Sequence, residues 1–162
     1  MWVMLALLQA EELFAKMEER LLKAKELKIV FETKIGGREY TGTIGVRGER
    51  VSYAFDAVKF ESDTLRRSVL TIFARGCAGI ADYEAVRGKA PPELKPAKLR
   101  LGPKKDRLQR VDFDVDSGAM IGTYSVSLWI DTKTHLPVER EFRQGDTATT
   151  EKYTVTAPAD RR

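Results

Sequence analysis

The stretch from Tyr124 to Phe142 constrains the fold of this chain more than any other. Aliphatic residues occupy every second position between Ser125 and Ile130, which is the period of a strand with two different faces. The next residues, Asp131 to Thr134, have short polar side chains of the kind that hydrogen-bond their own backbone in turns. Pro137 then suits the start of a second strand, because proline has no N–H to give to a ladder. The stretch therefore predicts a β-hairpin with a loop of about five residues.

The same two-residue period recurs along much of the chain. Lys28 to Phe55 reads as three strands divided by glycine turns, and short turns of this kind join antiparallel neighbours. Val111 to Val115 and Tyr153 to Val155 alternate in the same way. We therefore expect about seven strands in one antiparallel sheet.

Two segments have helical spacing instead. Glu11 to Glu26 carries one apolar stripe between Glu and Lys/Arg residues, which predicts an amphipathic helix that packs on a core. Glu61 to Arg87 predicts a second helix, for which Ser62 or Asp63 can provide the N-cap. Glycines weaken the middle of that segment, so we expect a break there and a second short helix toward Val86.

Four parts of the sequence together resemble the LolA-like proteins, the outer-membrane lipoprotein carrier-like domains of bacterial envelopes. These parts are an apolar leader, a charged helix, LKIVFETKIGG as a first strand and LWIDTKTHLPV in the late hairpin. The resemblance implies an α+β fold in which a large curved antiparallel sheet, a half-barrel, is covered on its concave face by an N-terminal helix and a broken central helix. It also implies a periplasmic or otherwise exported protein. We therefore expect a non-enzymatic envelope protein that binds an acylated lipid or lipoprotein between sheet and helices.

Seven large side chains on the apolar strand faces are the candidates for the wall of such a ligand cavity. They are Phe31, Ile44, Tyr53, Phe55, Phe113, Leu128 and Phe142. A sheet with so many aromatic residues either leaves an apolar cavity beneath its helices or fills that space as a dry core, and close packing is the rule in protein interiors. In the second case the chain is a protein-interaction or sensor domain with a fully packed sheet.

Residues 1–10, MWVMLALLQA, are apolar and end in a small residue, which is typical of the second half of a secretory signal peptide. The segment lacks a basic start, so a truncated export signal and the first turns of the helix stand as equal alternatives. Residues 11–162 are enough for a single domain with its own core. The single cysteine, Cys77, can form no internal disulfide, and we expect it to be a small buried hydrophobe.

Histidine and cysteine occur once each, and pairs among the carboxylates cannot be identified from sequence spacing alone. The one histidine, His135, lies in the hairpin turn, and no Cys/His cluster has metal-ligand spacing. Asp112, Asp114 and Asp116 alternate along a strand and lack the glycine and glutamate of a calcium loop, so we expect an outward acidic face. The sequence predicts no catalytic residue, no metal site and no cofactor.

Positive charge is concentrated between Arg87 and Arg110, where nine basic and two acidic residues give a net charge of +7 in a chain whose total is +4. Such a segment can contact the headgroups of an anionic membrane, and contact with nucleic acid is a weaker alternative. The simplest account is a basic surface that contacts only solvent. The residues that would contact a membrane are Arg87, Lys89, Lys95, Lys98, Arg100, Lys104, Lys105 and Arg107.

Overall fold

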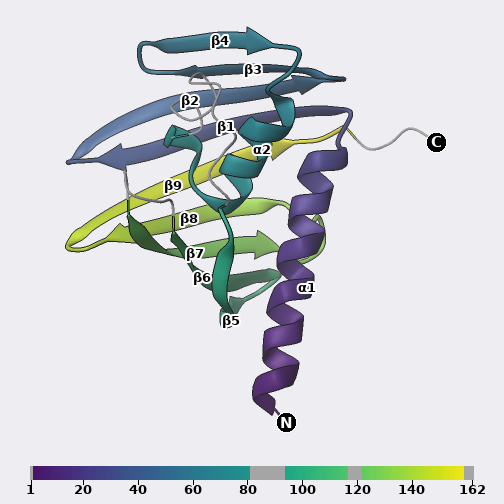
Figure 1. The fold of residues 1–162 in the computed structure, drawn as a ribbon, viewed down its shortest axis with the longest axis vertical. Helices are drawn as coiled ribbons and strands as arrows, with labels where there is room; N and C mark the ends of the chain where they lie inside the picture. Colours follow the sequence, from purple (N-terminus) through teal and green to yellow (C-terminus); the bar gives the residue numbers. More distant parts are fainter. Residues whose placement is uncertain (1, 81–93, 117–121, 159–162) are drawn as a thin grey trace.

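The computed structural model describes residues 2–80, 94–116 and 122–158. Within these residues nine strands form one antiparallel sheet, and two α-helices lie across one of its faces (Figure 1). The elements in chain order are α1 (Trp2–Lys23), β1 (Glu26–Ile35), β2 (Arg38–Arg47), β3 (Arg50–Phe55), β4 (Val58–Ser62), α2 (Arg66–Arg75), the 3-10 turn η1 (Ala78–Ile80), β5 (Pro96–Lys105), β6 (Leu108–Asp116), β7 (Thr123–Asp131), β8 (Pro137–Gln144) and β9 (Thr147–Thr156). The expected α+β fold with a large curved antiparallel sheet is confirmed.

The sheet consists of two meanders joined side by side. Its strand order is β4-β3-β2-β1-β9-β8-β7-β6-β5, so the first strand of the chain pairs with the last. In that pair Phe31 lies opposite Tyr153, and both side chains face the helices. The described edges of the sheet are β4 and β5, which belong to different halves of the chain.

The predicted hairpin is present as β7 and β8. Val126 lies opposite Phe142 and Leu128 opposite Arg140 in the ladder. Oδ1 of Asp131 accepts the backbone N–H groups of Lys133 at 2.8 Å and of Thr134 at 3.2 Å. This side chain therefore closes the turn by the mechanism that the sequence predicts.

The helices bury apolar stripes against the same face of the sheet. On α1 the buried side chains include Phe14, Met17 and Leu21, at the three- and four-residue spacing of one helix face. On α2 they include Leu70 and Phe73. α1 packs against β5 and α2, so the two helices together cover the core.

The helices differ from expectation in two details and agree with it in a third. α1 begins at Trp2, so the apolar leader continues the amphipathic helix, which ends at Lys23. Ser62 does not cap α2: its hydroxyl accepts the N–H of Leu65 at 3.2 Å in the turn before the helix, whose N-cap makes no side-chain hydrogen bond. The expected break is confirmed, because α2 ends at Gly76, while the short helix expected toward Val86 lies outside the described residues.

Candidate ligand-binding face between sheet and helices

The seven predicted cavity residues all belong to the core beneath the helices or pack against it. Phe31, Ile44, Tyr53, Phe113 and Leu128 are buried, whereas Phe55 and Phe142 are partly buried. They do not form one group. The strand order places four of them on β1 to β3 and three on β6 to β8, with β9 between the two sets.

The first set lies beneath α2 and η1. The ring of Phe31 is 6.3 Å from that of Tyr53 and 5.3 Å from that of Phe55. The hydroxyl of Tyr53 donates to the backbone carbonyl of Ala78 at 2.8 Å. This end of the core is therefore tied to the segment that follows α2.

The second set is covered by α1. Phe14 meets Phe113 edge-on, with ring centroids 5.2 Å apart. On the neighbouring strands the ring of Phe142 lies 4.1 Å from that of Tyr124. Apolar and aromatic contacts of this kind hold α1 to the sheet without a directional bond.

Arg140 is fully buried on β8, next to β9, the strand that separates the two sets. Its Nη1 donates to the carbonyl of Phe73 at 2.5 Å and its Nη2 to that of Ala74 at 2.9 Å. These carbonyls belong to the last turn of α2, where backbone acceptors have no partner within the helix. The guanidinium also lies 5.6 Å from the ring centre of Tyr153. Arg140 therefore ties the C-terminal end of α2 to the centre of the sheet.

Glu151 lies opposite Arg140 on β9 and is 1% exposed. Its carboxylate accepts the backbone N–H of Ala78 at 2.8 Å and that of Gly79 at 3.0 Å. It also accepts the hydroxyl of Tyr153 at 2.5 Å. We call Arg140, Glu151 and Tyr153 the clamp, because they hold both the end of α2 and the start of η1 against the sheet.

Burial shifts the pKa values of Tyr153 in the clamp and of Tyr124 on β7. Burial raises the pKa of Tyr153 well above its ordinary value, and Glu151 adds to the shift while Arg140 opposes it. Burial also raises the pKa of Tyr124, with a further contribution from Cys77. Both phenols therefore stay neutral at physiological pH.

An apolar groove lies between α1 and β5. It has a volume of about 490 Å³ and apolar walls formed by Phe14, Ala15, Leu22, Pro96 and Leu99. Glu18 and Arg75, which are joined by an ion pair at 2.6 Å, also line it. Because Phe14 packs on Phe113, the groove leads toward the second set of predicted residues.

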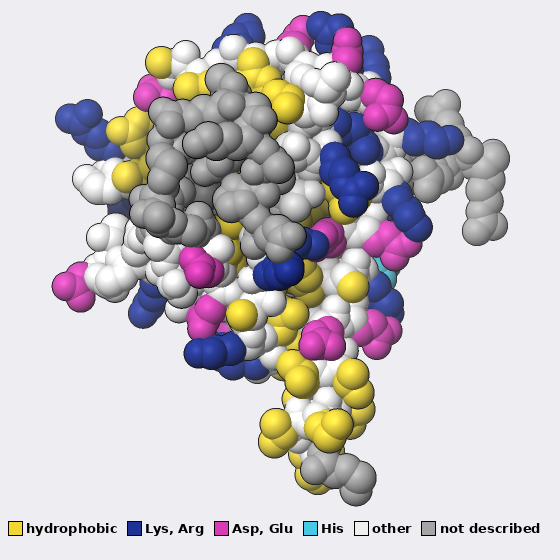
Figure 2. All heavy atoms as spheres, viewed as in Figure 1, with side chains coloured by type: hydrophobic (Ala, Val, Ile, Leu, Met, Phe, Trp, Pro, Cys, Tyr) yellow, Lys and Arg dark blue, Asp and Glu magenta, His cyan; other side chains and the backbone are white. Residues whose placement is uncertain are grey.

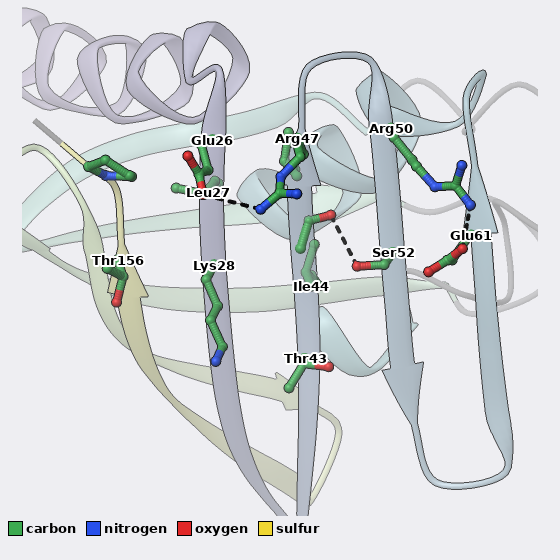
Figure 3. Close-up of a pocket in the computed structure, with 13 residues that line it drawn as sticks. Glu26, Leu27, Lys28, Thr43, Ile44, Arg47, Arg50, Ser52, Glu61 and Thr156 are labelled. Atoms are coloured by element: carbon green, nitrogen blue, oxygen red, sulfur yellow. Dashed lines mark hydrogen bonds and ion pairs between the residues drawn. The ribbon is translucent and has the colours of Figure 1, made fainter. Parts of the chain in front are cut away.

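A larger depression, of about 730 Å³, lies over β1, β2 and β3 and is polar at its rim (Figure 3). Arg50 and Glu61 pair across it at 2.5 Å, and Arg47 lies 3.9 Å from Glu26. Of the seven predicted residues, only Ile44 lines it. Its charged rim suits a polar partner better than an acyl chain.

The predicted membrane-contacting residues lie mainly on the edge strand β5. Arg87 and Lys89 are outside the described residues. Lys95 precedes the strand and Arg107 follows it, the latter paired with Asp131 at 2.6 Å. The residues on the strand itself are Lys98, Arg100, Lys104 and Lys105, all exposed.

Residues considered for chemistry occupy structural positions. Cys77 is buried beside the clamp, and His135 occupies the hairpin turn with a positive φ of 58°. Asp112, Asp114 and Asp116 lie on the strand face opposite the core residue Phe113; Asp112 pairs with Arg110 at 2.9 Å and is buried, whereas Asp116 is exposed. In the part of the chain that the structure describes, no three His, Cys, Asp or Glu residues gather as a metal site would require.

Sequence reasoning missed the clamp. Arg140 shares a strand face with Phe142, and Glu151 shares one with Tyr153, so alternation alone puts both charges inward. A charged residue in register with an apolar face is the signal that marks such a pair, because charges are rarely buried without partners.

No family model and no curated protein matches the sequence. Among solved structures, MucB is similar over 96% of this chain and 61% of its own, with a TM-score of 0.54 and 17% identity. The chain thus spans less than two thirds of the length of MucB. MucB in complex with MucA(peri) aligns over 93% of this chain and 57% of its own (TM-score 0.46, 15% identity), and LprF from Mycobacterium bovis over 94% and 97% (0.42, 10%). The likeness to MucB shows a shared fold.

Proposed function

We propose that this chain is a non-enzymatic binding domain of the bacterial envelope whose ligand is apolar and acylated, either a lipid or a lipoprotein. The observation that carries the proposal is the apolar groove between α1 and β5, which adjoins the aromatic core through Phe14. The LolA-like resemblance of the sequence and the fold shared with MucB support the same class of function.

The way in which the two helices are held favours entry beside α1. Buried hydrogen bonds tie α2 to the sheet through Arg140, and they tie the η1 turn after it through Glu151; both would be costly to break without water. α1 meets β5 through apolar side chains, and it meets α2 through the Glu18–Arg75 pair. At the C-terminal end of α1, Arg66 of α2 also donates to the carbonyls of Leu22 at 2.8 Å and of Ala24 at 2.7 Å. An acyl chain can replace apolar contacts with its own, at about 0.8 kcal/mol per buried CH₂. We therefore expect the part of α1 before Leu22 to shift, while α2 and the end of α1 that Arg66 holds stay in place when ligand binds.

The groove also offers charge at one side for the polar end of such a ligand. Lys23 and Arg75 line it together with their ion-pair partners, Glu19 at 2.5 Å and Glu18 at 2.6 Å, so a ligand anion would replace the exposed Glu19 as the partner of Lys23. The side chain of Lys23 is 76% exposed, so it can reach an acyl carboxylate or a phosphate without losing a buried contact.

Titration with a fluorescent fatty acid tests the proposal. Leu99→Glu places a charge on the groove wall, and we expect it to weaken binding at least tenfold, because a carboxylate there meets apolar ligand atoms. The matched control is Val58→Glu, since Val58 is a partly buried aliphatic residue on the opposite edge strand. Circular dichroism checks that both variants fold. Equal affinities of wild type and Leu99→Glu would contradict binding in the groove.

A second candidate function is protein interaction with a fully packed sheet. Burial of five of the seven predicted cavity residues favours it, as does the charged depression over β1 to β3. If the folded protein binds no acyl ligand at micromolar concentration, this second function becomes the better account.

A further inference from the structure

The first two turns of α1 extend beyond the body of the protein. Figure 1 shows the N-terminal end of the helix projecting past the sheet, and Figure 2 shows apolar side chains over that projection. We call residues 2–8 the apolar tip. Its exposed large side chains are Trp2 (86%), Val3 (83%), Met4 (71%), Leu5 (51%), Leu7 (41%) and Leu8 (59%).

Apolar side chains surround the helix of the tip on all sides. Successive residues of an α-helix point about 100° apart, so the four consecutive residues from Trp2 to Leu5 cover the whole circumference. A protein groove covers one side of a helix, whereas lipid covers all sides. The first charged residue is Glu11, three residues after the tip.

The seven residues of the tip are long enough to enter one leaflet of a bilayer. Seven helical residues measure about 10 Å at 1.5 Å per residue, about a third of a hydrocarbon core of about 30 Å. Among the described residues, no helix has the length and apolar character needed to cross a membrane. Residues 2–8 can therefore reach into the hydrocarbon of one leaflet.

Positive charge lies beside the helix that carries the tip. β5 packs against α1 and exposes Lys98, Arg100, Lys104 and Lys105. Lys98 is 3.8 Å from Asp114, whereas Lys104 and Lys105 have no ion-pair partner within the described part of the chain. Figure 2 shows a group of Lys and Arg side chains at the lower left edge of the body, near the place of β5 in Figure 1, with Asp and Glu side chains also along this lower edge.

The acidic residues of α1 just after the tip only partly offset the positive charge of β5. Glu12 pairs with Lys16 at 2.8 Å, which leaves Glu11 as the acidic residue nearest the tip. The four exposed basic residues of β5 outnumber Glu11 and the exposed Asp106 of the following turn, so the side of the protein that carries α1 and β5 favours anionic headgroups.

We propose that the apolar tip inserts into one leaflet of an anionic lipid bilayer, while the exposed basic residues of β5 contact its headgroups. Such docking places α1 and β5, the two walls of the apolar groove, at the membrane surface. This inference goes beyond ligand binding and does not depend on it.

Partitioning of the full chain onto vesicles of phosphatidylcholine and phosphatidylglycerol tests the insertion. In a Trp129→Phe background, Trp2 is the one tryptophan, so its emission should shift to the blue and be quenched by brominated acyl chains. Leu5→Glu with Leu8→Glu should reduce partitioning at least tenfold. The matched control is Ile35→Glu, because Ile35 is 46% exposed and lies away from the tip, in the first hairpin.

The contribution of charge is tested separately. Lys104→Gln and Lys105→Gln should each weaken binding to anionic vesicles about fivefold and reduce its salt dependence. Lys59→Gln, on the opposite edge strand, should leave binding unchanged. Vesicles of phosphatidylcholine alone should bind less protein than anionic ones.

Two results would overturn the proposal. One is partitioning that is unaffected by the paired substitutions in the tip. The other is a wild-type protein that does not bind vesicles but forms an oligomer without lipid, as measured by analytical ultracentrifugation. If the paired substitutions dissociate that oligomer, the tip is covered by copies of this chain and not by lipid. Fatty-acid binding in solution stays intact in either case, which separates this test from that of the proposed function.

Discussion

Arg140→Met should destabilise the protein by about 3–5 kcal/mol, the cost of breaking a buried charged network. Methionine retains much of the packing volume of arginine but gives no hydrogen bond. The carbonyls of Phe73 and Ala74 then lose their donors at 2.5 and 2.9 Å, and each buried acceptor without a partner costs about 1–3 kcal/mol. The carboxylate of Glu151, 1% exposed, also loses the cation opposite it in the ladder.

Urea denaturation measures this loss, with an unchanged m-value showing that the unfolding transition is the same. The matched control is Arg143→Met, because Arg143 lies on the same strand with its side chain 66% exposed and paired with Glu141. That change should alter stability by no more than about 0.5 kcal/mol.

A double-mutant cycle with Glu151→Gln tests whether the clamp acts as a unit. Because Tyr153 contacts both residues, we expect a coupling of about 0.5–3 kcal/mol between the two substitutions. A loss below about 1 kcal/mol for Arg140→Met would refute the reasoning, since it would show that α2 does not depend on the buried donors.

Three further predictions concern the core, alkaline pH and the apolar tip. Leu128→Ala should cost about 2–5 kcal/mol in denaturation experiments, because the side chain is fully buried, and a smaller loss accompanied by weaker acyl binding would place it in a ligand cavity. Tyr124 and Tyr153 have raised pKa values in the folded state, so their contribution to stability is complete below the unfolded pKa of about 10 and is lost as pH rises above it. Absorbance at 295 nm should show both phenols ionising only on unfolding, and early ionisation of all tyrosines would contradict this. Deleting residues 2–8 should change stability by less than about 1 kcal/mol, because their large side chains are exposed, whereas extending the deletion through the buried Ala10 should cost more.

The strands could be predicted where the signal is local. Alternation in β1 and β7 places Ile29 and Leu128 inward, and both are buried. β4 gave a weaker signal, because its five residues, VKFES, include only two large apolar ones. Pro96 favoured a connector, yet it begins β5 at the edge of the sheet, where proline is tolerated. For these reasons the sequence indicated about seven strands and the structure describes nine.

The arrangement of the site depends on contacts that no local pattern contains. The pairing of β1 with β9 joins the meander β1–β4 to the meander β5–β9. It thereby places the predicted cavity residues in two separate sets, one in each meander. The partners of Arg140 lie 66 and 67 residues earlier in the chain, so its role appears only when α2 is placed on the sheet. The groove likewise requires α1 and β5 to be neighbours, although Phe14 and Leu99 are far apart in sequence.

Photocrosslinking with a diazirine fatty acid, followed by peptide mass spectrometry, tests the central claim most directly. If the acyl chain enters between α1 and β5, labels should concentrate on residues 14–22 and 96–99, and unlabelled fatty acid should compete for them. Leu99→Glu should reduce this labelling, while Val58→Glu should not. Labelling no stronger than that of the urea-unfolded chain, or confined to the depression over β1 to β3, would contradict the account.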